Sequence, residues 1–214
     1  MTARRLPPVL AGAGIAAAAI ALVLAVGLAV DHWPFAFDRR IITGLRAWGG
    51  PAWLPSLAID VTALGSPPVL AILVAVVAGL LLVTGRARTA IVTMIACASG
   101  GAVVSLVKID IARPRPTLVP HLVPAAHASF PSGHAAGSAI VYMTLAALAT
   151  RLTDDRAVHR YIVGIAVLLV AAIGCSRVYL GVHWPSDVMA GWSFGTLWAL
   201  GWWWATARVH ARNR

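Results

Sequence analysis

The sequence contains few charges and few residues suited to a disulfide or metal framework. Only 11% of its 214 residues are charged, whereas an ordinary soluble domain carries about a quarter. With 60% hydrophobic residues and a mean hydropathy of +0.84, the chain cannot cover its own surface with water-compatible groups. Its two cysteines lie inside apolar runs and do not indicate a disulfide scaffold or a zinc site. The composition therefore predicts an integral membrane protein.

The charges that are present are biased in sign and in type. Seventeen basic residues against seven acidic ones give a net charge of +10; Lys108 is the only lysine, and every acid is an aspartate. In a soluble chain this balance would suggest nucleic acid as a partner, but in a membrane protein cations accumulate in cytoplasmic loops, so we expect no nucleic acid. The sequence contains no carboxylate cluster suited to Mg²⁺ or Ca²⁺, and we expect neither a metal nor a cofactor.

Six charge-free stretches approach the length of a membrane span, which needs roughly 20 apolar residues. They cover residues 6–30, 61–85, 89–107, about 132–150, 161–176 and 188–207. The first is longer than a signal-peptide core of about 7 to 15 residues, so we expect an uncleaved helix. No repeat or linker divides the chain. The sequence therefore predicts a single all-α domain over residues 1–214, an integral membrane bundle of six transmembrane helices.

A further helix is expected between the first two spans. Residues 35–48 place Phe37, Ile41, Leu45 and Trp48 on one helical face. This pattern is typical of an amphipathic helix that lies in the membrane interface, here on the outer leaflet. A loop helix packed against the rest of the protein fits the same pattern equally well.

The distribution of cations predicts how the helices are oriented. The ten on one side would be Arg4, Arg5, Arg86, Arg88, Arg151, Arg156, Arg160, Arg208, Arg212 and Arg214, and the seven on the other Arg39, Arg40, Arg46, Lys108, Arg113, Arg115 and Arg177. Because cations concentrate on the cytoplasmic side, both termini are expected there, in the cell membrane, with the loops after spans one, three and five outside. The bias is sharper if Lys108, Arg115 and Arg177 are present for chemistry.

Three polar clusters lie at span ends that face the same side of the membrane. KIDIARPRP (108–116) leaves the third span, FPSGH (130–134) enters the fourth, and SRVYLGVHWPSD (176–187) connects the fifth to the sixth. Polar groups next to membrane spans are costly and are usually functional. This topology allows the three clusters to form one site.

The residue types in these clusters suit a phosphate. Lys108, Arg115 and Arg177 supply cations, and arginine forks match phosphate oxygens while lysine acts as a compact charge. Ser132 and Gly133 stand at a predicted helix start, where free N–H groups and the helix dipole favour an anion. Together they predict an anion site on one face of the membrane.

Two histidines add reactive groups to this site. His134 follows the predicted helix start, and His183 precedes Asp187 by four residues, beside a helix expected to begin near Pro185. A carboxylate bonded to one imidazole nitrogen fixes the tautomer and leaves the other nitrogen free as a nucleophile or base. The cluster indicates metal-free phosphoryl transfer, in which one histidine attacks and the other protonates the leaving oxygen.

The spacing of these residues resembles the three-part signature of the type 2 phosphatidic acid phosphatase (PAP2) superfamily, in its membrane branch. The matched residues are Lys108, Arg115, Pro116, Pro131, Ser132, Gly133, His134, Ser176, Arg177, His183 and Asp187. PSGH alone would be weak evidence, but all three parts occur in order at the family's spacing. The motif region, 108–187, covers over a third of the chain.

The resemblance implies a role for each matched residue. His183 would be the nucleophile that forms a phosphohistidine, and Asp187 would orient it. His134 would protonate the leaving group and then activate water. The residues that would hold the phosphate are Lys108, Arg115, Ser132, Gly133 and Arg177.

Three further residues are auxiliary candidates. Arg113-Pro114 is a second Arg-Pro pair two residues before Arg115, and the family's spacing selects Arg115 as the motif residue. Arg113 is left as a candidate for contact with a second phosphate or a lipid headgroup. Pro131 and Ser176 are auxiliary by their motif positions.

The implied function is a membrane phosphatase acting at the outer face on a lipid phosphate or diphosphate. Phosphatidic acid, phosphatidylglycerophosphate and a polyprenyl diphosphate all fit, with the tail among the helices. The alternatives are a lipid-phosphate transporter or flippase, a phosphotransferase, and a vanadium haloperoxidase. Transport leaves the His183–Asp187 pair unexplained, and six apolar spans argue against the haloperoxidases, which are soluble.

Overall fold

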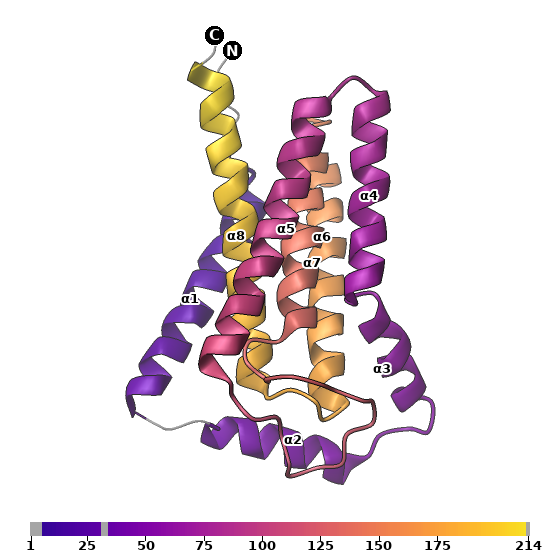
Figure 1. Ribbon diagram of the computed structural model, residues 1–214, viewed down its shortest axis with the longest axis vertical. Coiled ribbons are helices and arrows are strands. Elements are labelled where there is room, and N and C mark those ends of the chain that lie inside the picture. The colour runs from indigo at the N-terminus through magenta and orange to yellow at the C-terminus, as the bar shows by residue number, and fades with distance from the viewer. Residues whose placement is uncertain (1–5, 31–33, 213–214) are drawn as a thin grey trace.

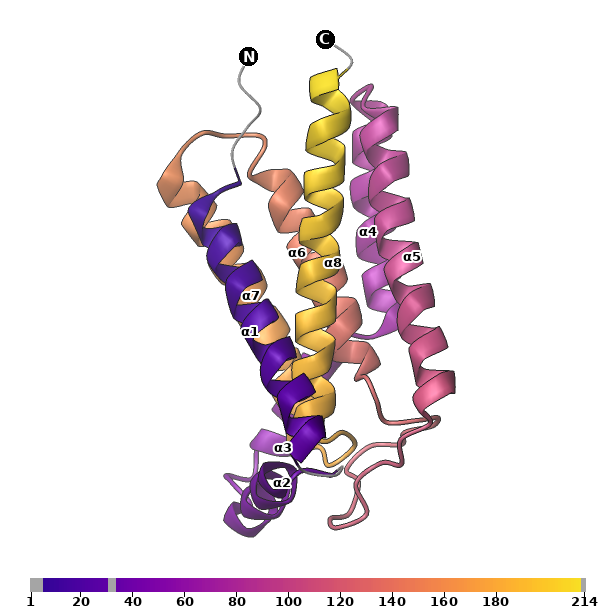
Figure 2. The same cartoon turned by 90° about the vertical axis from the view of Figure 1, so that its left-hand side faces the viewer.

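The computed structural model describes residues 6–30 and 34–212, and within them every regular element is a helix (Figure 1). The helices are α1 (Pro8–Val30), α2 (Ala36–Trp48), α3 (Leu54–Ala63), α4 (Pro67–Val83), α5 (Ala87–Ile111), α6 (Gly133–Ala149), α7 (Arg156–Tyr179) and α8 (Pro185–Arg212). The predicted all-α class is therefore confirmed. The helices α1, α4, α5, α6, α7 and α8 run along the bundle, while α2 lies across one end beside the short helix α3 (Figures 1 and 2).

The polar motifs gather at the end of the bundle that α2 covers. The segment 112–132, between α5 and α6, and the segment 180–184, between α7 and α8, both lie there with α2 and α3 (Figure 1). The beginning of α1 and the end of α8 lie at the opposite end (Figure 2). Because successive long helices alternate in direction, motifs far apart in sequence meet at one end.

The central helix, α6, has a surface of small residues and packs against α4, α5, α7 and α8. Its closest neighbour is α8, which presents Gly191 and Gly195 to it. A side chain at Gly195 would begin 2.6 Å from the carbonyl oxygen of Ala136, and one at Gly191 would begin 2.9 Å from the Ala136 nitrogen. Small residues let helix backbones approach closely in this way. This contact fixes the register between the second and third motifs.

Within the described residues, length and hydropathy identify two helices sufficient to cross a bilayer, α5 and α7, each with a mean hydropathy of 2.1. The pair α3 and α4 would be a third span, bent by 45°. The prediction of one uninterrupted helix over 61–85 is wrong, because Pro67 and Pro68 lack the N–H groups needed to continue α3. The pair of prolines instead begins α4, where those donors are not required.

Helix ends place several motif residues in helices. α5 continues to Ile111 and α7 to Tyr179, so Lys108 and Arg177 stand in last helical turns. α8 begins at Pro185, as predicted, and Asp187 lies in its first turn. These side chains are therefore held by regular backbone.

The helix expected over 35–48 is present as α2, and it has two different faces. Asp38 and Ile42 are buried against the protein, whereas Ile41 and Trp48 are exposed. Leu45, predicted on the same face as Ile41 and Trp48, is half-buried against the core instead. The inward face of α2 therefore carries a buried charge.

Substitution of Gly195 by alanine tests the contact between α6 and α8. We expect Gly195→Ala to destabilise the fold by about 1–3 kcal/mol, because the new methyl group meets backbone that cannot move aside. Gly201→Ala is the matched control on the same helix: beyond the adjacent helix backbone, a Cβ added there meets no heavy atom of the described residues within 4 Å, and the change should not lower stability. Thermal unfolding in detergent measures both, and equal melting temperatures would contradict the close contact.

Candidate active site

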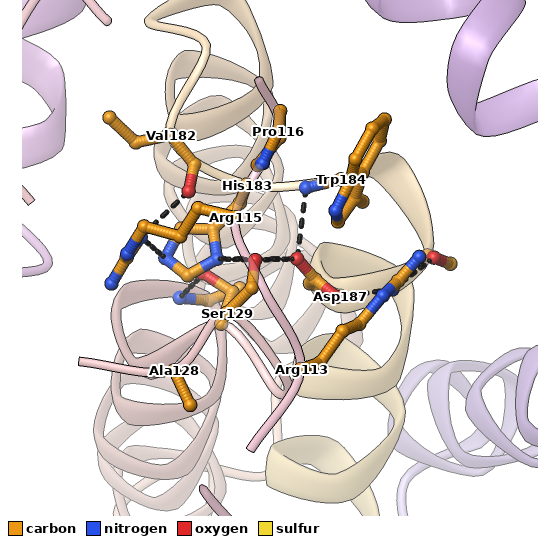
Figure 3. Close-up of polar contacts among 12 residues, drawn as sticks. Arg113, Arg115, Pro116, Ala128, Ser129, Val182, His183, Trp184 and Asp187 are labelled. Atoms are coloured by element: carbon orange, nitrogen blue, oxygen red, sulfur yellow. Dashed lines mark hydrogen bonds and ion pairs between the residues drawn. The ribbon is translucent and has the colours of Figure 1, made fainter. Parts of the chain in front are cut away.

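His183 is the centre of a buried cluster at the α2 end of the bundle (Figure 3). It lies in the segment between α7 and α8, and only 2% of its surface is exposed. Its two ring nitrogens face different groups. Nδ1 faces a carboxylate and a hydroxyl, and Nε2 faces a guanidinium.

The Nδ1 atom of His183 faces Ser129 and Asp187. It lies 3.4 Å from Ser129 Oγ and 3.5 Å from Asp187 Oδ2. The Ser129 hydroxyl in turn donates to Asp187 Oδ2 at 2.5 Å, and the Trp184 N–H donates to the same oxygen at 2.9 Å. Figure 3 shows His183, Ser129 and Asp187 in one line of contacts. This arrangement favours a proton on Nδ1 and leaves Nε2 with its lone pair.

The Nε2 atom of His183 faces Arg115, whose Nη1 is 3.3 Å away. Backbone carbonyls hold the guanidinium in place: Nη1 donates to Val182 O at 2.7 Å, Nε to His127 O at 3.0 Å and Nη2 to Ala126 O at 2.6 Å. A fixed cation thus stands beside the nitrogen that has the free lone pair. Anything bound to Nε2 would lie against a positive charge.

The surroundings keep His183 neutral. Burial lowers the pKa of its imidazole to about 4; Asp187 opposes the shift through its hydrogen bond and charge, while Arg115 and Arg177 reinforce it. At neutral pH the ring is therefore uncharged, as a nucleophile must be.

Two more cations complete the positive side of the cluster. Lys108 Nζ donates to Ala128 O at 2.7 Å, and its stem passes beside Gly133, where a side chain would begin 3.8 Å from Lys108 Cε. Arg177 is 6% exposed and donates from Nη1 to Thr62 Oγ1 at 3.2 Å. Its Nε is buried and has no hydrogen-bond partner within residues 6–30 and 34–212. An unsatisfied buried donor is costly, and an anion would satisfy it.

The start of α6 brings the second motif to this cluster. Ser132 is the N-cap of α6; its hydroxyl accepts from the Ala135 N–H at 3.5 Å, and its own N–H donates to Asp187 O at 3.0 Å. The hydroxyl of Ser132 thus caps α6, while its N–H joins α6 to α8. His134, one residue into α6, is half-buried and within electrostatic range of His183 and Arg177. The histidine of the second motif therefore lies close enough to His183 and Arg177 to interact with them electrostatically.

Arg113 lies under the site, where it makes two ion pairs. Its Nη1 is 2.5 Å from Asp187 Oδ1 and its Nη2 is 3.0 Å from Asp38 Oδ2. The residue is 4% exposed, and its guanidinium stacks 5.6 Å from the Trp184 ring centre. This placement argues against a contact of Arg113 with a second phosphate or a headgroup, because its charge is paired with two buried carboxylates and Nη1 also donates to Ser186 Oγ.

The other auxiliary candidates have structural contacts. The Ser176 hydroxyl donates to Ile173 O, one turn earlier in α7, at 2.6 Å. Pro131 is buried immediately before the N-cap of α6. In the described part of the chain, no group of three or more His, Cys, Asp or Glu residues is arranged to hold a metal ion.

Sequence reasoning missed three residues of this cluster: Asp38, Ser129 and Ser186. Asp38 and Ser186 are 0% exposed and bonded to each other, with Ser186 Oγ donating to Asp38 Oδ2 at 2.6 Å. Ser129 stands one residue before the matched FPSGH motif, a proximity that could have drawn attention to it. Asp38 precedes Arg39 and Arg40, and this run of charges is typical of an exposed surface.

Comparison with known proteins agrees with the geometry. The model of the PAP2 superfamily matches residues 87–211, more than half of the chain. The chain belongs to the PAP2 superfamily. Phosphatidylglycerophosphatase B of Bacillus subtilis is 30% identical over 146 residues, which cover 68% of this PAP2 protein and 71% of that relative. An undecaprenyl-diphosphatase of Sulfolobus acidocaldarius is 40% identical over 68 residues, 32% of this chain but only 29% of that protein.

Two solved structures share the fold of this PAP2 protein. A transmembrane PAP2-type phosphatidylglycerolphosphate phosphatase from Bacillus subtilis superposes with a TM-score of 0.80 at 24% identity, covering 90% of this chain and 96% of that one. LpxE from Aquifex aeolicus gives a TM-score of 0.62 at 24% identity, covering 79% and 96%. The family and these folds indicate a membrane-embedded helical phosphatase.

Removal of the Arg113 charge tests the buried ion pairs. We expect Arg113→Gln to destabilise the protein by about 3–5 kcal/mol, because Asp38 and Asp187 would then be buried without their cation. Arg40→Gln, on the exposed side of α2, should change stability by no more than about 0.5 kcal/mol. Denaturant unfolding in detergent compares the two, and an equally mild effect of both would refute the account.

Proposed function

We propose that this PAP2 protein is an integral membrane phosphatase that hydrolyses a lipid phosphate or diphosphate at the outer face. The observation that carries the proposal is His183, held at Nδ1 by Ser129 and Asp187 and facing Arg115 at Nε2. The names of the relatives, a phosphatidylglycerophosphatase and an undecaprenyl-diphosphatase, support a lipid phosphate or diphosphate as the substrate. Phosphatidic acid belongs to the same chemical class.

The proposed topology is a single domain with six membrane crossings. The crossings are α1, the bent pair α3 and α4, α5, α6, α7 and α8. Both termini are then cytoplasmic, and the site faces outward. The exposed Ile41 and Trp48 side chains of α2 support a position in the outer interface, where such apolar groups leave water.

The first chemical step forms a bond between His183 and phosphorus. The Nε2 lone pair attacks the phosphate, the bond from phosphorus to the leaving oxygen breaks, and His134 gives that oxygen a proton. Asp187, through Nδ1, stabilises the positive charge that develops on the imidazole. The product is a phosphohistidine and a released lipid alcohol, or a lipid monophosphate from a diphosphate.

The second step returns the enzyme to its starting state. His134, now neutral, takes a proton from water while that water attacks phosphorus, and the bond from phosphorus to Nε2 breaks. Inorganic phosphate leaves and His183 is again neutral. Each step transfers charge to phosphate oxygens, where fixed cations lower the barrier without reorganising.

Donors from four residues are assigned to the phosphate. Arg115 stands beside the nucleophile, Lys108 retains two of its three N–H donors, and Arg177 offers its unpaired Nε. The fourth is the Gly133 N–H at the start of α6, where the absence of a side chain permits close approach. The motif residue Ser132 supports this donor by capping the helix.

Loss of the nucleophile tests the mechanism. We expect His183→Ala to reduce phosphate release at least about 10⁴-fold, because no covalent intermediate forms, and wild type to be fully active in EDTA. His159→Ala is the matched control, because this histidine lies at the other end of α7, where its Nε2 is 2.8 Å from Thr153 O. Release of phosphate is measured in detergent from phosphatidic acid, phosphatidylglycerophosphate and a polyprenyl diphosphate.

An acid-labile radiolabelled phosphate should be trapped on wild type and be absent from His183→Ala. Lipid movement without phosphate release would identify a transporter and refute the proposal. Full activity of His183→Ala, or loss of activity in EDTA with rescue by Mg²⁺, would refute the mechanism.

Accessibility to a membrane-impermeant maleimide tests the orientation. In a background with Cys97 and Cys175 replaced by alanine, we expect Leu118→Cys to be labelled in intact cells, because residue 118 lies exposed in the segment at the site end. Arg86→Cys, in the connection before α5, should be labelled only after lysis. The reverse pattern would place the site in the cytoplasm.

A further inference from the structure

Asp38 is a buried charge on a helix that contributes no motif residue. Its carboxylate accepts from the Ser186 N–H at 2.8 Å, from Ser186 Oγ at 2.6 Å, from Arg113 Nη2 at 3.0 Å and from the Phe35 N–H at 3.2 Å. The side chain is 0% exposed. A surface helix does not need such a residue to pack, since an apolar side chain would fill the space at lower desolvation cost.

Asp38 is connected through Arg113 to Asp187, the acid proposed to orient His183. Arg113, which donates to Asp38 through Nη2, donates through Nη1 to Asp187 Oδ1 at 2.5 Å and to Ser186 Oγ at 2.8 Å. The opposite oxygen, Asp187 Oδ2, is the one that faces His183 and accepts from Ser129. One carboxylate therefore divides its two oxygens between Arg113 and the nucleophile.

The charge of Asp38 determines how strongly Arg113 attracts Asp187. The single positive charge of Arg113 is shared between the two negative charges of Asp38 and Asp187, so it cannot fully neutralise either carboxylate. With Asp38 neutral, Arg113 would pair with Asp187 alone. This stronger pair would draw the carboxylate away from His183 and reduce its ability to stabilise the imidazolium that forms during attack.

We propose that Asp38 is a positioning residue: through Arg113 and Ser186 it sets the place and the effective charge of Asp187, and thereby the orientation of His183. The proposal rests on the proposed function, since it concerns the same nucleophile. It assigns α2 a part in the chemistry in addition to covering the site. Asp38 touches neither the substrate nor the reacting atoms.

A double-mutant cycle separates this role from a merely structural one. In the wild-type background we expect Asp38→Asn, which keeps size and shape, to slow phosphohistidine formation roughly tenfold, because small displacements of reacting groups cost about this much or more. In an Asp187→Asn background the same change should cost less than about twofold, because residues that act as a unit are non-additive. Single-turnover assays with enzyme in excess make the slow variants measurable.

A structural role predicts a different pattern. If Asp38→Asn only reduces the folded fraction, the same loss appears in both backgrounds, and this result would overturn the proposal. Vanadate affinity is the second readout: the cations that hold the anion are untouched, so the apparent Kd should stay within about twofold of wild type. A large loss of vanadate affinity together with the rate would also count against the proposal.

Two further variants complete the experiment. Asp60→Asn, an exposed acid on α3, is the matched control and should leave the rate unchanged. If Asp38→Asn does not fold, Ser186→Ala takes its place in the same cycle, because it removes the hydroxyl shared by Asp38 and Arg113. We expect Ser186→Ala to slow phosphohistidine formation roughly threefold in the wild-type background and to have no effect in the Asp187→Asn background. A wild-type protein that releases phosphate from none of the lipids would refute the proposed function. An active wild type in which the effects of Asp38→Asn and Asp187→Asn on the rate are additive would refute only the role of Asp38.

Discussion

One guanidinium shared by two buried carboxylates holds together the end of the protein where the three motifs meet. Arg113 comes from the segment after α5, Asp38 from α2 and Asp187 from the first turn of α8. A buried charge without a partner is strongly unfavourable, so each of these segments depends on the other two being in place. The hydroxyl and N–H of Ser186 bind the same carboxylate and join the network to α8. Charge pairing therefore joins these segments at the site in addition to apolar contacts such as those of Ile42 with Val119 and Trp184.

The motif residues divide into those that build this frame and those left to act on a ligand. Ser132 uses its N–H on Asp187 and its hydroxyl as a helix cap, and Ser176 bonds to its own helix. Arg115, by contrast, has its guanidinium aimed at His183, and Arg177 has a buried donor unpaired within the described ranges. The motif therefore includes both residues with structural roles and residues available to a ligand. Their contacts in the structure distinguish the two groups.

Local signals were sufficient for much of the helical fold and for the grouping of motifs. His183 and Asp187 are four residues apart on either side of a helix start marked by Pro185, and this spacing predicts their contact from sequence alone. Asp38 could not be found in this way, because its partner Ser186 lies 148 residues further on and its neighbours Arg39 and Arg40 suggest an exposed surface. The break between α3 and α4 was missed for another reason. Hydropathy measures apolar surface, whereas Pro67 and Pro68 act through a missing backbone donor.

The pairing of Arg113 has a consequence for which phosphates the site would accept. Histidines aside, Arg113, Asp38 and Asp187 sum to a formal charge of −1, while Lys108, Arg115 and Arg177 contribute +3, so the cluster carries +2. A terminal phosphate has two ionisable oxygens and brings this sum to zero, whereas a phosphodiester carries a single negative charge and leaves an excess buried. Most lipids of a bilayer are phosphodiesters. In the proposed mechanism, Asp38 and Asp187 would therefore allow the enzyme to act on terminal phosphates without hydrolysing the phosphodiester lipids that surround it.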